Sequence, residues 1–175
     1  NDPRRFGCVL FAKNNEPHAL LDKLGPEPLE KSFDGEYLFQ KAHKHRAAIK
    51  TFIMNQRIVV GVGNIYANEA LFLAGIHPNQ MANTITLAQH QTLASAIKKV
   101  LKAAIKQGGT TLKDFRQSDG KPGYFSQALT IYDREGLACI QCKTFIKAFR
   151  LGQRATYFCP SCQKCPSKQL HKQKN

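Results

Sequence analysis

Acidic residues are scarce in this 175-residue sequence, because 12 aspartates and glutamates stand against 26 lysines and arginines and the formal net charge is +14. A small acidic ligand does not call for so strong a positive field, whereas a polyanion does. Apolar runs of the roughly 18 residues that a membrane span needs are absent, so we expect no integral membrane protein. The first residues are polar and basic with no apolar run behind them, so we expect no signal peptide.

The positive charge is concentrated in two regions of the chain. Glu69 is the only acidic residue between Tyr37 and Lys113, and none occurs from Gly136 to Asn175. A solvated basic surface is one interpretation of this distribution. Two separate regions poor in acidic residues favour a groove that follows a phosphate backbone.

The spacing of apolar residues predicts a mainly α chain with a small β unit in its last third. Asn64 is expected to cap one helix, and Thr86 and the pair Gly108-Gly109 bracket the clearest one. A strand-like run at 9–12 has no neighbouring strands, so we expect a fragment or a processed product. The expected helices cover about 36–54, 65–74 and 87–107, a long loop covers 110–125, and short strands cover 129–132, 144–149 and 155–158.

Two pairs of cysteines have the spacing of a zinc site. Cys139 and Cys142 form one C-x2-C pair, Cys159 and Cys162 form the other, and sixteen residues separate them. We expect a short hairpin to bring the four thiolates into a tetrahedron around one structural Zn²⁺, with no open position for chemistry. Two disulfides in a secreted domain are the alternative. Cys165 is predicted not to be a ligand, and Cys8 is predicted to be a buried small hydrophobe.

Three further patterns suggest contacts with nucleic acid. The turn before Asn64 is glycine-rich and opens a helix, where free amides favour a phosphate, so Asn64 could bind that phosphate or only cap the helix. Arg154 lies between Gln153 and Thr156 on the zinc hairpin and could bind phosphate or be a solvated charge. At residues 1–7 two arginines lie beside a phenylalanine. An arginine can read a base edge and a phenylalanine can wedge between stacked bases, but the segment could equally be an ordinary turn.

In this order the motifs resemble bacterial formamidopyrimidine-DNA glycosylase over almost the whole chain. The resemblance is carried by NDPRRFG at 1–7, LGPEPL at 24–29, VVGVGNIYANEALFLAGIHP at 59–78, GGTTLKDF at 108–115, SDGKPGYF at 118–125 and QRATYFC at 153–159. It implies a helix–two-turn–helix domain followed by a β-hairpin zinc finger, preceded by remnant strands of an N-terminal β-sandwich. The implied divisions are 1–29 for the β-sandwich remnant and linker, 30–125 for the helical domain with a lesion-covering loop, 126–164 for the zinc finger and 165–175 for a basic tail.

The resemblance also implies base-excision repair of oxidised purines such as formamidopyrimidines and 8-oxoguanine. Members of the family hydrolyse the N-glycosidic bond and nick the strand by β,δ-elimination, so the implied partner is double-stranded DNA with oxidised purines or abasic sites. The implied setting is a monomer in the bacterial cytoplasm, associated with the nucleoid. Two alternatives remain open, an endonuclease VIII-type enzyme for oxidised pyrimidines and a non-catalytic zinc-finger module that binds DNA.

The family's residue roles transfer to matching positions of this sequence. Arg4 would face the orphaned cytosine, Phe6 would fill the gap left by the flipped base, and Lys113 would lie in the loop over the flipped purine. Asn64 and Arg154 would hold phosphates beside the lesion, and Arg154 would also be the proton donor for δ-elimination.

Two departures from the family pattern affect these expectations. His45 stands where many members carry a DNA-contacting lysine. The family's N-terminal Pro-Glu-Leu-Pro-Glu segment, whose proline amine is the nucleophile, does not occur in the sequence. An amine that forms a Schiff base with C1′ is required for the elimination chemistry. We therefore expect the 175 residues to bind DNA and zinc but to be inactive alone.

Overall fold

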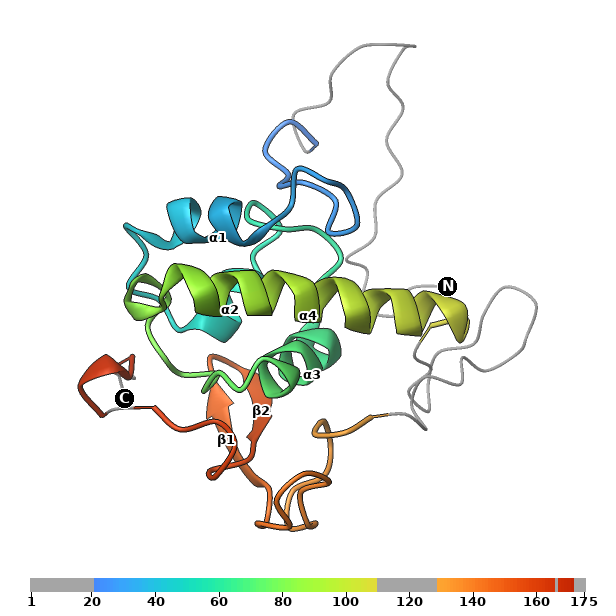
Figure 1. The fold of residues 1–175 in the computed structure, drawn as a ribbon, viewed down its shortest axis with the longest axis vertical. Coiled ribbons are helices and arrows are strands. Elements are labelled where there is room, and N and C mark those ends of the chain that lie inside the picture. Colours follow the sequence, from blue (N-terminus) through green and yellow to red (C-terminus); the bar gives the residue numbers. More distant parts are fainter. Residues whose placement is uncertain (1–20, 110–128, 166, 172–175) are drawn as a thin grey trace.

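The computed structural model describes residues 21–109, 129–165 and 167–171 (Figure 1). The mainly helical architecture followed by a two-stranded hairpin confirms the predicted fold class. The strand predicted at 9–12 and the loop predicted at 110–125 lie outside the described residues. The elements are α1 (Gly35–Ala42), α2 (Ile49–Ile53), α3 (Asn64–Leu73), η1 (Ala82–Thr84), α4 (Leu87–Lys106), β1 (Lys147–Leu151), β2 (Arg154–Phe158) and η3 (Ser167–Gln169).

The long helix α4 is determined by its own sequence. Thr86 accepts a hydrogen bond from the backbone N–H of Gln89, whose side chain binds back to the N–H of Thr86, so the two residues form a capping box. Apolar residues recur along one face of the helix and are buried. Gly108 and Gly109 have φ of +71° and +89°, and they end the helix as the sequence predicts.

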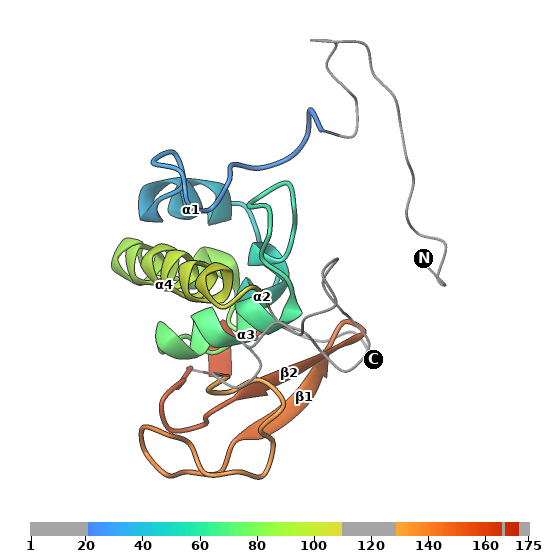
Figure 2. The same cartoon turned by 90° about the vertical axis from the view of Figure 1, so that its right-hand side faces the viewer.

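The helices stack in layers, with α4 between α1 and α3 and the hairpin beyond α3 (Figure 2). Gly35 allows the close approach of α1 to α4, because a Cβ there would lie 2.4 Å from the Cα of Gln91. One large hydrophobic core joins the four helices, and a smaller one joins Phe72 of α3 to the cysteine-bearing segment. The hairpin is therefore packed against the helical layer. None of the described helices is long and apolar enough to cross a membrane.

The single helix predicted over 36–54 is wrong, because the chain forms α1 and α2 with a non-helical linker between them. The backbone N–H groups of Ile49 and Lys50 donate to the carbonyls of Gln80 and Pro78 (2.7 and 3.2 Å) instead of to carbonyls of a preceding turn. Ala48 also forms a β-bridge with Met81. Pairing with a distant segment therefore replaces the helical hydrogen bonds at this position.

The C-terminal strands differ from their predicted bounds. β1 pairs with β2 in antiparallel register from Lys147↔Phe158 to Leu151↔Arg154. β1 begins later than predicted because Phe145 pairs with Ala138 within the cysteine knuckle. The strand predicted at 129–132 does not form, since the backbone of this segment binds the side chain of Glu69 instead.

Candidate nucleic-acid interface and zinc centre

The four predicted cysteine ligands come together at the end of the hairpin. The sulfur atoms of Cys139, Cys142, Cys159 and Cys162 all lie within 4.8 Å of one another. Cys139 and Cys159 are fully buried, whereas Cys142 is exposed. The backbone N–H of Cys162 donates to the sulfur of Cys159 (3.4 Å), an arrangement that suits a thiolate.

This sulfur set fits one tetrahedral Zn²⁺. Zn–S bonds of about 2.3 Å in a tetrahedron place neighbouring sulfurs about 3.8 Å apart. The sulfurs of Cys142 and Cys159 are 3.4 Å apart and those of Cys139 and Cys162 are 3.9 Å apart. Both distances are much longer than the bond of about 2.05 Å in a disulfide, so these cysteines are free. Four thiolates leave no open coordination position, and Cys165 is not part of the cluster.

Arg154 is exposed at the turn that joins the two strands. Gly152 in this turn has φ of +58°, a conformation that favours glycine and lets the chain reverse within two residues. Lys50 of α2 holds the start of β2 next to this turn, because its Nζ donates to the carbonyl of Ala155 (2.8 Å) and to the hydroxyl of Thr156 (2.7 Å). The exposed arginine is therefore carried by a turn with a buried anchor.

Lys50 is only 1% exposed, and its environment changes its titration. Burial, together with the positive charge of Arg154, lowers the pKa of Lys50 to about 7. Near neutral pH the amine therefore loses its charge readily, which reduces the cost of burying it beside a guanidinium. The exposed guanidinium of Arg154 therefore supplies the positive charge that suits this end of the molecule to an anion.

Asn64 is the first residue of α3 and does not cap it. The N-cap is Gly63, which has no side-chain cap bond, so the prediction that Asn64 caps the helix is wrong. Asn64 Oδ1 is buried without a hydrogen-bond partner among the described residues. Asn68, one turn later, donates to the carbonyl of Asn64 (2.7 Å) and accepts from the N–H of Tyr157 (2.9 Å). Asn68 thereby fixes the first turn of α3 against β2.

Glu69 anchors the segment that leads into the zinc-binding hairpin. Its carboxylate is 4% exposed and accepts hydrogen bonds from the backbone N–H groups of Thr130, Ile131 and Tyr132 and from the hydroxyl of Thr130. A carboxylate that accepts several backbone N–H bonds forms strong, charge-assisted interactions. The one acidic residue of the first acid-poor region is thus a buried structural anchor.

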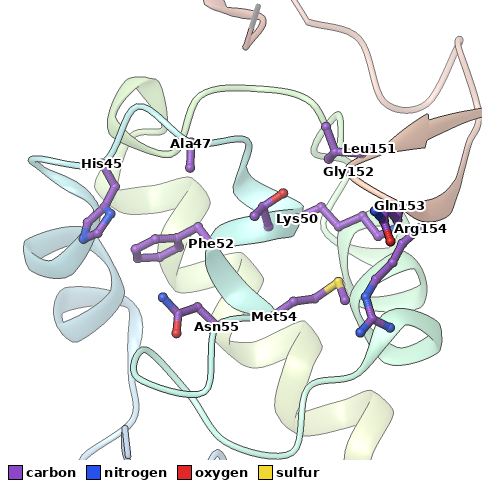
Figure 3. A pocket seen from close by; sticks show the side chains of 11 residues that line it. His45, Ala47, Lys50, Phe52, Met54, Asn55, Leu151, Gly152, Gln153 and Arg154 are labelled. Atoms are coloured by element: carbon purple, nitrogen blue, oxygen red, sulfur yellow. The ribbon is translucent and has the colours of Figure 1, made fainter. Parts of the chain in front are cut away.

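A hollow of about 440 Å³ runs along α2 and reaches the hairpin turn that carries Arg154 (Figure 3). His45, from the linker before α2, lies at one end of it, and Gln153 and Arg154 of the hairpin turn lie at the other. The exposed ring of His45 packs against Phe52 with its centroid 5.3 Å away. The structure therefore places His45 and Arg154 on the rim of one concave, positively charged surface.

Comparison with known proteins agrees with this geometry. Residues 24–116 match the model of the formamidopyrimidine-DNA glycosylase H2TH domain, where H2TH abbreviates the helix–two-turn–helix. Residues 136–164 match the model of the zinc finger found in formamidopyrimidine-DNA glycosylase (Fpg) and isoleucyl-tRNA synthetase. The chain belongs to the formamidopyrimidine-DNA glycosylase family. Within Fpg it corresponds to the H2TH domain and the zinc finger.

Individual proteins that are similar to this chain are also named formamidopyrimidine-DNA glycosylases. The Fpg of Alcanivorax borkumensis is 57% identical over 164 residues, which are 94% of this chain and 61% of that protein. The crystal structure of Fpg (MutM) from Thermus thermophilus superposes with a TM-score of 0.85 at 39% identity and covers 93% of this chain and 62% of its own. Lactococcus lactis Fpg, in complex with DNA containing an abasic site, has a TM-score of 0.76 at 35% identity and covers 83% and 54%. The chain thus spans about 61% of the curated relatives it matches.

The predicted Fpg site residues fall into two groups. Arg4, Phe6 and Lys113 lie outside the described residues. His45, Asn64, Arg154 and the four cysteines are all placed, and the predicted zinc site is confirmed. The roles of His45, Asn64 and Arg154 toward DNA stay predictions.

Sequence reasoning missed three residues that position this Fpg surface. Lys50, Asn68 and Glu69 bind backbone or side-chain atoms on the zinc-finger side of the molecule. The sequence does mark Glu69 as unusual, because it is the only acidic residue between Tyr37 and Lys113. It does not mark Lys50 and Asn68, since they are ordinary polar residues within helical segments.

Proposed function

We propose that residues 1–175 form the DNA-gripping part of a base-excision repair enzyme. The observation that carries this proposal is that Asn64 and Arg154 begin two elements, α3 and β2, which pack against each other. α3 is fixed to β2 through Asn68, and the hairpin turn is fixed to α2 through Lys50. A phosphate backbone needs such fixed donors at regular intervals, and phosphate contacts set the register of a protein on DNA.

The substrate and chemistry follow from the family. We propose excision of oxidised purines by N-glycosidic hydrolysis, with strand nicking by β,δ-elimination, for the whole protein, acting as a monomer in the bacterial cytoplasm. Within it Asn64 and Arg154 bind the phosphates beside the lesion, and Arg154 donates the proton for δ-elimination. Arg4 faces the orphaned cytosine, and Phe6 fills the gap left by the flipped base. Lys113 belongs to the covering loop, and His45 lies on the phosphate-binding surface.

The zinc centre supplies stability and not chemistry in this proposal. When bound, Zn²⁺ holds four thiolates and has no site for water or substrate. The chain's own residues then act on DNA from a rigid hairpin. The match to the Fpg H2TH model over residues 24–116 favours this function over that of an unrelated zinc-finger module.

Borohydride trapping tests whether the 175 residues bind DNA without carrying out the covalent step of the reaction. We expect the 175-residue chain to bind a duplex with an abasic site, yet to form no trapped covalent complex, because it brings no N-terminal proline amine to C1′. A full-length relative under the same conditions is the positive control. A covalent complex formed by the 175 residues would refute this part of the proposal.

Replacement of Arg154 tests the phosphate grip. Arg154→Ala is expected to weaken binding to damaged and undamaged duplexes alike, and to reduce the slope of log K against log salt by about 0.9 for each phosphate that the variant no longer binds. Binding is measured by fluorescence anisotropy at several salt concentrations. Lys102→Gln, at an exposed position of α4, is the matched control for removal of one charge. An unchanged slope in Arg154→Ala would count against the proposed grip.

A further inference from the structure

A short segment after the zinc finger is attached to the helical domain. Residues 167–171, here called the C-terminal strap, follow the end of the matched zinc finger at residue 164. Gln169 accepts a hydrogen bond from the N–H of Met81 (2.8 Å), and the N–H of His171 donates to the carbonyl of Asn79 (2.8 Å). Leu170 forms an antiparallel β-bridge with Gln80. The strap thus begins as the short helix η3, and its end, at residues 169–171, pairs with the helical domain as a strand would.

The segment that receives the strap is paired on its other side as well. The N–H of Ala82 donates to the carbonyl of Ala47 (2.9 Å), and the N–H of Asn83 donates to the carbonyl of His45 (3.1 Å). Residues 79–83 therefore lie between the strap and the linker that precedes α2. The strap also contacts this linker directly, because Nδ1 of His171 lies 3.0 Å from the carbonyl oxygen of Arg46.

Side-chain hydrogen bonds add to this attachment. Gln80 is only 4% exposed, and its Nε2 donates to the side-chain oxygen of Gln169 (3.0 Å). The Nδ2 of Asn79 donates to the carbonyl of His171 (3.0 Å). Together with the backbone pairing, these two side-chain bonds give the strap a defined position on the helical domain.

The strap and the linker bring together positive charge from two distant parts of the sequence. Residues 43–46, here called the basic linker, have the sequence HKHR, and all four are exposed. Lys168 of the strap is also exposed. No acidic residue occurs in either segment or from Gly136 to Asn175. The combined surface carries positive charge without a carboxylate of its own.

This surface continues into the concave site described above. His45 belongs to the basic linker and also lines the hollow that ends at Arg154 (Figure 3). A phosphate backbone that contacts Arg154 and follows the hollow along α2 would arrive at the basic linker and then at the strap. Regularly spaced negative charges are what distinguishes a nucleic acid from a compact anion.

We propose that the C-terminal strap and the basic linker together form an accessory phosphate-binding surface, which contacts the DNA backbone beyond the lesion. The inference rests on the proposed DNA-binding function and extends its footprint. Lys168 supplies a charge to the DNA backbone. The bonds of the strap to Asn79 and Met81, and the bond between the His171 ring and the carbonyl of Arg46, hold the strap beside the basic linker. The strap thereby lengthens the DNA path from the hairpin turn toward the C-terminal end of the chain.

The test compares duplex lengths in the full 175-residue, zinc-loaded protein. Salt-dependent binding is measured with a long duplex, which extends well beyond an abasic-site analogue on both sides, and with a short one that covers only its neighbourhood. Lys168→Gln is expected to lower the salt slope on the long duplex by about 0.9, so that the fall in affinity between 50 and 200 mM salt shrinks by about 3.5-fold. On the short duplex the slope is expected to stay that of the wild type.

Two more variants separate charge from attachment. His171→Pro keeps Lys168 but removes the N–H that binds Asn79, and we expect it to reduce the slope on the long duplex too. Lys102→Gln on α4 changes the net charge equally and is expected to have no effect. If Lys168→Gln binds the long duplex with the wild-type slope, the accessory surface is refuted.

The outcomes distinguish this proposal from the proposed function. Arg154→Ala should reduce the slope on both duplexes, whereas strap variants should act on the long one alone. A reduced slope with Arg154→Ala and an unchanged one with Lys168→Gln would refute only the strap. A wild-type protein that binds neither duplex would refute both. Competition by polyglutamate that depends on Lys168, without any effect of Lys168→Gln on DNA, would assign the surface to an acidic protein and also refute the proposal.

Discussion

A Cys142→Ser variant is expected to lose its zinc and the fold of the hairpin together. The cysteine-bearing segment has a small core, formed by Phe72, Ile131, Ile146 and the two buried cysteines. So small a unit cannot be stable on burial alone, and binding of a structural zinc contributes on the order of 10–16 kcal/mol of coupled folding energy. Removal of one thiolate eliminates much of that energy. Zinc content, measured by a chromogenic chelator, should fall from one per chain toward zero.

DNA binding should disappear with the zinc, because Arg154 is carried by the same hairpin. Cys165→Ser is the matched control, since Cys165 lies outside the four-sulfur cluster and its replacement should leave both zinc and binding intact. Chelation of zinc from the wild-type protein should reproduce the effect of Cys142→Ser. Retention of one zinc and normal DNA affinity by Cys142→Ser would show that another residue completes the site.

Glu69→Ala is expected to detach the hairpin from the helical layer without removing zinc. The replacement leaves the backbone N–H groups of Thr130, Ile131 and Tyr132 without their acceptor. A buried donor without a partner costs about 1–3 kcal/mol, so the free energy of unfolding should fall by roughly 3 kcal/mol or more. Urea-induced unfolding of the zinc-loaded protein, followed by circular dichroism, measures this decrease.

The zinc content of Glu69→Ala separates its effect from that of Cys142→Ser. Zinc should remain bound, because Glu69 does not touch the sulfur cluster, while DNA affinity should decrease as Arg154 and Asn64 lose their fixed relation. Glu36→Gln, at an exposed position of α1, is the control for removal of one carboxylate and should have wild-type stability. Wild-type stability in Glu69→Ala would mean that the anchor contributes nothing.

The parts of the fold that the sequence predicted correctly depend on local interactions. The ends of α4 follow from Thr86, Gln89 and two glycines within the helix's own neighbourhood. The zinc site follows from spacing alone, because each C-x2-C pair brings its two sulfurs together whatever surrounds it. Such features are visible in one sequence, since all the partners lie within a few residues or repeat a fixed spacing.

The parts that were missed depend on partners far away in the chain. The break between α1 and α2 is made by hydrogen bonds to Pro78 and Gln80. Glu69 replaces the predicted strand at 129–132 with a turn, and its partners lie 61 to 63 residues away. Lys50 supports a turn 105 residues away. Neither propensity nor periodicity carries this information, because tertiary contacts override both.

The central claim is that the H2TH domain and the zinc hairpin together hold the phosphate backbone of damaged DNA. It is tested most directly by the affinity of the zinc-loaded 175-residue protein for an abasic-site duplex as salt is varied. A linear fall of log K against log salt, with a slope of about −0.9 for each phosphate contacted and several contacts in total, is the predicted result. Absence of binding, or an affinity that does not change with salt, would contradict the claim.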